Sequence, residues 1–176
     1  MSIILGVEKI HQYFFSNFYF RNLLLGPNKG RVHGKKVGGI SMTEELEDVL
    51  IVDDDADICD LLSDYVKSTG AFRNIVVAED GSYAIDKLRN QQFSLILLDL
   101  NLPRKSGLEV LDYIRGEKSH NLDAVIMISG EFDENTIKKA VEVGGRCFLA
   151  KPFSQELVVD KIKKHVIDKL EKKEAS

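Results

Sequence analysis

Five short apolar runs, each followed by an amphipathic segment, constrain the fold of this chain more than any other feature. The third run stops at a single carboxylate, Asp99. Continuously apolar runs are typical of parallel strands covered on both faces, and amphipathic segments between them indicate crossover helices. The pattern therefore predicts an α/β fold with strands at Val49–Val52, Ile75–Ala78, Leu95–Leu98, Ala124–Ile128 and Cys147–Ala150.

The segments between the strands predict five helices. One apolar face of the first helix is formed by Ile58, Leu61, Leu62, Tyr65 and Val66, at the spacing of successive helical turns. Gly70 follows as a stop signal. The last helix carries its apolar positions at Leu157, Val158, Ile162, Val166 and Leu170. The remaining helices are predicted over Ser82–Asn90, from Gly107 onward, over Glu134–Val143 and, for the last, over Ser154–Glu171.

Alternation of five strands and five helices permits few topologies. Because parallel crossovers are right-handed, the flavodoxin-like, doubly wound sheet with strand order 2-1-3-4-5 is the expected arrangement at this length. The first and third strands are then neighbours. No G-x-G-x-x-G follows the first strand and no G-x-x-x-x-G-K-[ST] occurs, so dinucleotide and P-loop nucleotide binding lose support.

Polar residues stand at the carboxyl ends of the predicted strands, where open α/β sheets place their ligands. Asp53 and Asp54 follow the first strand and Asp99 follows the third. Three carboxylates repel one another unless a cation lies between them. Oxygen ligands select a hard ion, and Mg²⁺ suits carboxylates combined with phosphate oxygens. The sequence predicts a Mg²⁺ site here, although a strand-end Asp more often only caps the next turn.

Lys151 after the fifth strand and Ser129 after the fourth add a cation and a hydroxyl donor to the same edge. Together with Asp99 they describe an aspartyl-phosphate site, in which a carboxylate is the nucleophile and a cation neutralises the transferred group. The Lys151–Pro152 bond is a plausible cis peptide that would direct the lysine side chain. Taken singly, Ser129 is more often a turn residue, Lys151 a solvated cation and the acidic run a helix N-terminus, so the joint placement of these residues carries the prediction.

The segments LIVDDDADI, LILLDLNLPRKSGLEVL, IMISG and FLAKPF resemble those of the response-regulator receiver domain of two-component signalling. The resemblance covers roughly residues 46–170. It implies that Asp53 and Asp54 hold Mg²⁺, that Asp99 is the phosphorylated residue, and that the backbone carbonyl of Asn101 completes the metal shell. Lys151 matches the lysine of the family site.

The resemblance also implies a conformational switch that responds to phosphorylation. Ser129 matches the Ser/Thr hydroxyl and Phe148 the aromatic residue that move on activation, and Gly130 stands where many relatives have Ala. Asp99 would receive its phosphoryl group from a sensor histidine kinase or phosphotransfer protein and lose it to water, without being an enzyme in the usual sense. We hypothesise that Asn101 and Glu131 flank the path of the attacking water and set the lifetime of the phosphoryl group on Asp99.

Three functions compete. We expect a single-domain response regulator that contacts a downstream target protein, since only a short charged tail, 171–176, follows the last helix. A degenerate receiver acting as a binding module is the alternative. A haloacid-dehalogenase-type phosphatase is disfavoured, because it needs a second Asp where this chain has Asn101.

Charge and composition change at about residue 42. Residues 1–41 carry six Lys and Arg against one acid, whereas the remainder carries 18 against 27. An acidic domain argues against direct nucleic-acid binding. The extension is expected to be disordered, or absent if Met42 is the natural start. Its longest charge-free span, Ile10 to Phe20, is too short to cross a bilayer, and a membrane contact is not favoured.

The chain has two cysteines, Cys59 and Cys147, at a spacing that fits no metal site. Cysteines that are few and far apart are typical of a reducing compartment, so we expect a cytoplasmic protein with both thiols in the core.

Overall fold

The structure is a computed structural model that describes residues 48–117, 119–131 and 133–174, with the backbone alone for 119–121 and 166–174. The expectations for the extension 1–41, for Met42 and for the end of the tail lie outside the described residues. So do the side chains of Val166 and Leu170.

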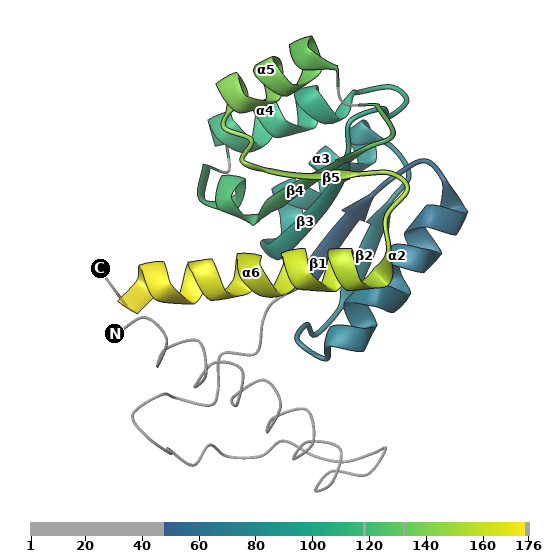
Figure 1. Ribbon diagram of the computed structural model, residues 1–176. Helices are drawn as coiled ribbons and strands as arrows, with labels where there is room; N and C mark the ends of the chain where they lie inside the picture. The colour runs from purple at the N-terminus through teal and green to yellow at the C-terminus, as the bar shows by residue number, and fades with distance from the viewer. Residues whose placement is uncertain (1–47, 118, 132, 175–176) are drawn as a thin grey trace, which may run out of the picture. The chain divides into compact units, whose positions relative to one another are not determined.

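A five-stranded parallel sheet forms the centre of the molecule (Figure 1). Its order is β2-β1-β3-β4-β5, which confirms the predicted doubly wound topology. β1 and β3 are direct neighbours, with Val52 beside Leu98, so their carboxyl ends lie at one level of the sheet edge. The strands span Asp48–Val52 (β1), Ile75–Ala78 (β2), Phe93–Asp99 (β3), Val125–Ser129 (β4) and Cys147–Ala150 (β5).

Helices cover both faces of the sheet. In Figure 1, α2 and α6 lie on one side and α3, α4 and α5 on the other. The helices span Ala56–Thr69 (α2), Gly81–Asn90 (α3), Gly107–Glu117 (α4), Glu134–Val143 (α5) and Gln155–Glu174 (α6), and a 3-10 helix, η1, spans Ser119–Ala124. Several bounds differ from expectation by one to three residues. β1 begins one residue earlier, β3 is longer at both ends, β4 is shifted by one residue because Ala124 belongs to η1, α3 begins at Gly81, and α6 begins at Gln155 and continues three residues past Glu171.

Capping residues explain where the helices begin and end. The Asp55 side chain accepts from the backbone N–H groups of Asp57 and Ile58, which satisfies donors that the first turn of α2 leaves unpaired. α2 ends at Gly70, whose φ of 61° is the left-handed conformation that glycine adopts without steric cost. The predicted stop at Gly70 is thus confirmed.

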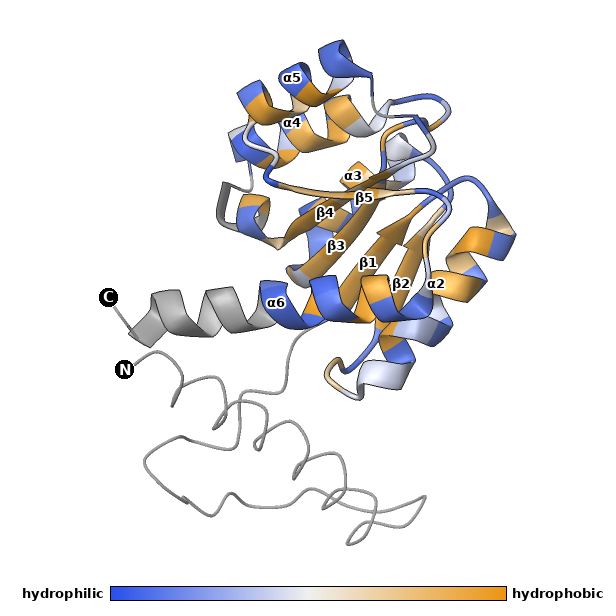
Figure 2. Ribbon diagram, in the orientation of Figure 1, coloured by the Kyte–Doolittle hydropathy of each residue, from blue (hydrophilic) through white to orange (hydrophobic). Residues whose placement is uncertain are grey.

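Two apolar layers sandwich the sheet. One joins the strands to α3, α4 and α5, and the other joins them to α2 and α6. Figure 2 shows the hydrophobic strands between helices whose outer faces are hydrophilic. Among the described residues, no helix combines the length and apolar character that a bilayer-spanning segment requires.

Two predicted core positions are wrong. Leu61 on α2 is 38% exposed and Leu157 on α6 is 44% exposed. The helical face that α2 buries is centred about one residue away from the predicted one, because Cys59 and Ser63 take the inward positions. Cys59 is buried as expected, whereas Cys147 is only half-buried at the edge of the core.

Candidate functional site

The carboxyl ends of β1 and β3 bring three aspartates together. Each of Asp53, Asp54 and Asp99 offers a carboxylate oxygen, and these three oxygens lie within 4.8 Å of one another. Asp53 is 1% exposed and Asp99 is 4% exposed, while Asp54 faces solvent. The pairing of β1 with β3 is the cause, since it places the residues after Val52 and Leu98 side by side. The predicted convergence of these aspartates is therefore present.

Lys151 reaches the same cluster from β5. Its Nζ donates to Asp53 Oδ2 at 2.7 Å and to Asp99 Oδ2 at 2.9 Å. Its backbone N–H donates to the Ser129 carbonyl oxygen at 2.8 Å, and the Lys151–Pro152 peptide bond is cis, as expected. Residues that are 52 and 98 positions apart in the sequence thus meet at one ammonium group.

Burial and hydrogen bonding shift the pKa values of this cluster in opposite directions. Burial raises the pKa of Asp53 by more than its hydrogen bonds from Lys151 and the Asp55 backbone lower it. For Lys151, burial is the largest single influence and lowers the pKa, but the hydrogen bonds to Asp53 and Asp99 and the charges of these two carboxylates together outweigh it, so the net pKa is raised. The ammonium therefore stays charged at neutral pH, and burial makes the ionised form of Asp53 costly.

The donor set fits a divalent cation. Three carboxylates face one ammonium, which leaves a surplus of negative charge and oxygen ligands only. Hard ions such as Mg²⁺ prefer oxygen ligands and tolerate a site with few protein groups. Backbone N–H groups of Asp55 and Asn101 donate to Asp53 Oδ1 and Asp99 Oδ1 at 3.1 and 3.2 Å and orient the two carboxylates. Asp53, Asp54 and Asp99 are the side chains able to hold such an ion.

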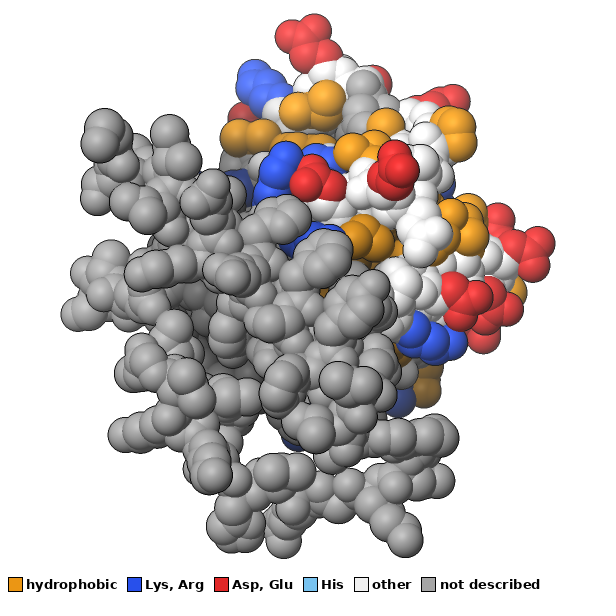
Figure 3. All heavy atoms as spheres, turned by 60° about the horizontal axis from the view of Figure 1, so that its bottom comes forward, with side chains coloured by type: hydrophobic (Ala, Val, Ile, Leu, Met, Phe, Trp, Pro, Cys, Tyr) orange, Lys and Arg blue, Asp and Glu red, His pale blue; other side chains and the backbone are white. Residues whose placement is uncertain are grey.

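Negative charge continues outward from this cluster onto α2. The exposed acids of this region include Asp54, Asp55, Asp57, Asp60 and Asp64. On the face seen in Figure 3, acidic side chains gather along the right-hand edge of the coloured surface. A surface with charge of one sign raises the local concentration of counter-ions. The surroundings of the site therefore favour cation entry.

Ser129 and Phe148 lie on β4 and β5, the two strands that follow β3 in the sheet. Ser129 is buried at the end of β4; its Oγ donates to the Glu131 carbonyl oxygen at 2.8 Å and accepts from the Glu131 N–H at 3.1 Å. Phe148, on β5 beside Met127, is half-buried and packs against the core. Apart from its chain neighbours Ser129 and Glu131, no described residue has an atom within 4 Å of where a Cβ on Gly130 would stand, which leaves space next to Ser129.

An ion pair that the sequence did not single out lies one loop away. Asp80, at the start of α3, is 3% exposed and contacts Arg104 of the loop between β3 and α4, with Oδ2 2.9 Å from an Arg104 guanidinium nitrogen. An acid before a glycine predicts only a helix cap, and no local signal relates it to an arginine 24 positions later.

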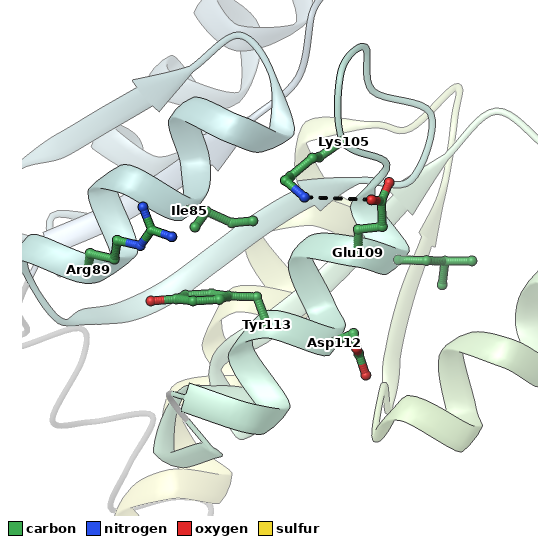
Figure 4. A pocket seen from close by; sticks show the side chains of 7 residues that line it. Ile85, Arg89, Lys105, Glu109, Asp112 and Tyr113 are labelled. Carbon is green, nitrogen blue, oxygen red and sulfur yellow. Dashed lines mark ion pairs between the residues drawn. The ribbon is translucent and has the colours of Figure 1, made fainter.

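A separate hollow of about 440 Å³ lies between α3 and α4 (Figure 4). Its charged groups are already paired: Lys105 lies 3.8 Å from Glu109, and Arg89 contacts Asp86 at 3.0 Å and lies over the Tyr113 ring. None of the carboxylates that bind Lys151 contributes to it. Its lining residues are Ile85, Arg89, Lys105, Leu108, Glu109, Asp112 and Tyr113.

Comparison with known proteins identifies the class. The family model for the response regulator receiver domain matches residues 49–163, so the chain belongs to this family. This match confirms the predicted resemblance to receiver domains of two-component signalling. The alternative of a haloacid-dehalogenase-type phosphatase is therefore discarded.

Solved structures of receiver domains share the fold. The chemotaxis protein CheY4 of Vibrio cholerae is 25% identical, with a TM-score of 0.62 over 68% of this chain and 98% of that one. A CheY-like receiver domain protein from Methanospirillum hungatei is 28% identical, with a TM-score of 0.62 over 73% and 98%. The receiver domain of a putative LuxO repressor protein from Vibrio parahaemolyticus is 29% identical, with a TM-score of 0.62 over 71% and 94%.

Proposed function

We propose that this receiver domain takes a phosphoryl group onto Asp99 from a phosphohistidine of a sensor histidine kinase or phosphotransfer protein. One observation carries the proposal: a single ammonium, Lys151, bridges Asp53 and Asp99 in a cluster that keeps more carboxylates than cations. A purely structural cluster would have matched charges. Surplus carboxylate at a strand end of a doubly wound sheet is instead typical of a ligand site.

The transfer is a nucleophilic substitution at phosphorus. A carboxylate oxygen of Asp99 forms the new P–O bond while the P–N bond of the phosphohistidine breaks, and the imidazole nitrogen keeps the electron pair. Lys151, within hydrogen-bond reach of Asp99, is placed to neutralise charge on the transferred oxygens. Hydrolysis of the resulting mixed anhydride by water restores the carboxylate and releases phosphate.

Asp53, Asp54 and Asp99, with the main-chain carbonyl of Asn101, are the proposed ligands of Mg²⁺. When bound, Mg²⁺ supplies positive charge to the phosphoryl oxygens and to the surplus carboxylates. The chain's own contribution is orientation: backbone N–H groups fix Asp53 and Asp99, and Lys151 holds the two acids together.

The proposed output is a phosphorylation-dependent contact with a downstream target protein. Ser129 is the proposed sensor, since its hydroxyl bonds to the Glu131 backbone, next to a position without a side chain at Gly130. A new phosphoryl group offers this hydroxyl a stronger, charge-assisted acceptor. Phe148, half-buried on the neighbouring strand, is the proposed second part of the switch.

Intact-mass spectrometry tests the proposal. Incubation with acetyl phosphate and Mg²⁺ is expected to add the mass of one phosphoryl group to the wild type and to Asp112→Asn, an exposed acid on α4. Asp99→Asn is expected to gain nothing. If the folded wild type also gains nothing, the degenerate, binding-only receiver is correct and the proposal is wrong.

A further inference from the structure

The loop from Asn101 to Ser106, which connects β3 to α4, is anchored at its base. The Leu100 N–H donates to the Ile128 carbonyl oxygen and the Gly107 N–H to the Leu100 carbonyl oxygen, both at 3.1 Å. A Cβ on Gly107 would stand 2.1 Å from the Asp99 carbonyl oxygen, so only glycine fits there. The two residues that flank the loop, Leu100 and Gly107, are thus fixed next to Asp99, whereas these bonds do not hold residues 101–106 themselves.

The tip of the same loop adopts an unfavourable backbone conformation. Arg104 has a φ of 63°, and it is the one non-glycine residue with positive φ in the described part of the chain. The Lys105 N–H donates to the Pro103 carbonyl oxygen at 2.7 Å and closes a three-residue turn around Arg104. Positive φ favours glycine or asparagine. An arginine at this position implies that its side chain compensates for the strain.

The compensating contact is the ion pair with Asp80. The Asp80 carboxylate is buried at the start of α3, where Oδ1 accepts from the Tyr83 N–H at 2.9 Å and Oδ2 contacts Arg104 at 2.9 Å. A second close contact lies beside it, since a Cβ on Gly81 would stand 2.1 Å from the Lys105 carbonyl oxygen. The tip of the loop therefore rests on α3 through one ion pair and one backbone contact.

We propose that Arg104 and Asp80 are positioning residues for the phosphorylation site, an inference that rests on the proposed function. Their ion pair holds the loop in its strained turn, and the loop in turn holds the Asn101 main chain, whose N–H donates to Asp99 Oδ1 at 3.2 Å. Without the pair, the turn at Arg104 relaxes and Asn101 loses its fixed place beside Asp99. The consequence is weaker Mg²⁺ binding, because groups that orient ligands set metal affinity.

Direct Mg²⁺ binding, measured by isothermal titration calorimetry, tests this inference without depending on phosphoryl transfer. Arg104→Gln and Asp80→Asn, which keeps an oxygen to cap α3, are each expected to weaken Mg²⁺ binding roughly tenfold, the low end of the effect of groups that orient metal ligands. The double variant should be no weaker than either single one, since both remove the same pair. Arg104→Lys keeps the charge and is expected to restore most of the affinity.

Arg73→Gln is the matched control. Arg73 also joins a loop to a largely buried aspartate, Asp48, but at the opposite end of β1. It is expected to leave Mg²⁺ affinity unchanged. Circular dichroism checks that each variant is folded.

The inference is overturned if Arg104→Gln binds Mg²⁺ as tightly as the wild type, or if Arg73→Gln weakens binding as much as Arg104→Gln does. Either result would mean that the Asp80 pair contributes only stability. If instead the wild type binds no Mg²⁺ and gains no phosphoryl group, the proposed function itself is wrong.

Discussion

The two ends of β1 carry aspartates in opposite electrostatic settings. At the start of the strand, Asp48 Oδ1 accepts from Arg73 at 3.1 and 3.2 Å and from the Asn74 side chain at 2.8 Å, and Gln91 lies at 3.5 Å from Oδ2. Just past its other end, Asp53 shares one ammonium with Asp99. One carboxylate has several donors, whereas at the other end several carboxylates compete for one cation.

The difference separates a structural carboxylate from a functional one. Complete pairing, as at Asp48, ties the loop after α2 to the sheet and adds stability. Surplus charge in a buried position opposes folding, because one ammonium and two backbone N–H groups offset desolvation and mutual repulsion only in part. A chain keeps such a cluster where a ligand completes it, and the carboxyl edge of a doubly wound sheet is where ligands bind. Three experiments test this contrast, in order of expected effect.

The largest effect is expected at Lys151. Lys151→Met removes the ammonium that bridges Asp53 and Asp99 and should lower the initial rate of phosphorylation by acetyl phosphate roughly 100-fold, the cost of losing one electrostatic donor at a reacting centre. The rate is followed by intact mass. Arg73→Gln, which removes the cation at the other end of β1, should phosphorylate at the wild-type rate. Equal rates for Lys151→Met and the wild type would remove the distinction between the two ends.

The second test reverses the comparison. Asp48→Ala deletes the carboxylate that binds Arg73 and Asn74 and should lower the free energy of unfolding by about 2 kcal/mol, typical of hydrogen bonds to a charged group. Urea denaturation measures the change. Phosphorylation of Asp99 should continue at the wild-type rate. A variant that lost phosphorylation while keeping its stability would show that the Asp48 end is also part of the functional site.

The contrast also explains what the sequence was able to predict. The apolar runs specify the strands, and right-handed crossovers leave one common order, so the meeting of Asp53, Asp54 and Asp99 follows from topology alone. Lys151 follows in the same way, since β5 ends at the same edge. These residues act through their position at strand ends, which the sequence pattern determines.

Other features depend on geometry that no pattern encodes. Apolar spacing predicts Leu61 and Leu157 in the core, but it does not reveal which part of a helical face the sheet covers, and both residues are partly exposed. The pairing of Asp80 with Arg104 depends on how closely a loop approaches α3, and the hydroxyl of Ser129 turned toward Glu131 is a choice among rotamers. Sequence periodicity gives no information about such contacts.

The smallest expected effect concerns the cost of the surplus charge itself. Because burial raises the pKa of Asp53, the ionised carboxylate is less favourable in the folded protein than in the unfolded chain. Asp53→Asn removes that charge, leaves Lys151 paired with Asp99, and should raise the free energy of unfolding at neutral pH by about 1 kcal/mol while weakening Mg²⁺ binding. Urea denaturation measures this rise in the free energy of unfolding. The control is Asp86→Asn, which removes an exposed acid on α3.

The pH dependence of this gain distinguishes relief of a buried charge from better packing. A group whose pKa is raised in the folded state favours folding below its unfolded pKa, and that contribution is lost as the pH rises through the folded pKa. The advantage of Asp53→Asn should therefore shrink as the pH falls from neutral toward the ordinary value of 3.8, where the wild-type carboxyl becomes protonated as well. An advantage that stays constant with pH, or none at neutral pH, would mean that Lys151 fully offsets the charge of Asp53, and the two ends of β1 would then differ only in geometry.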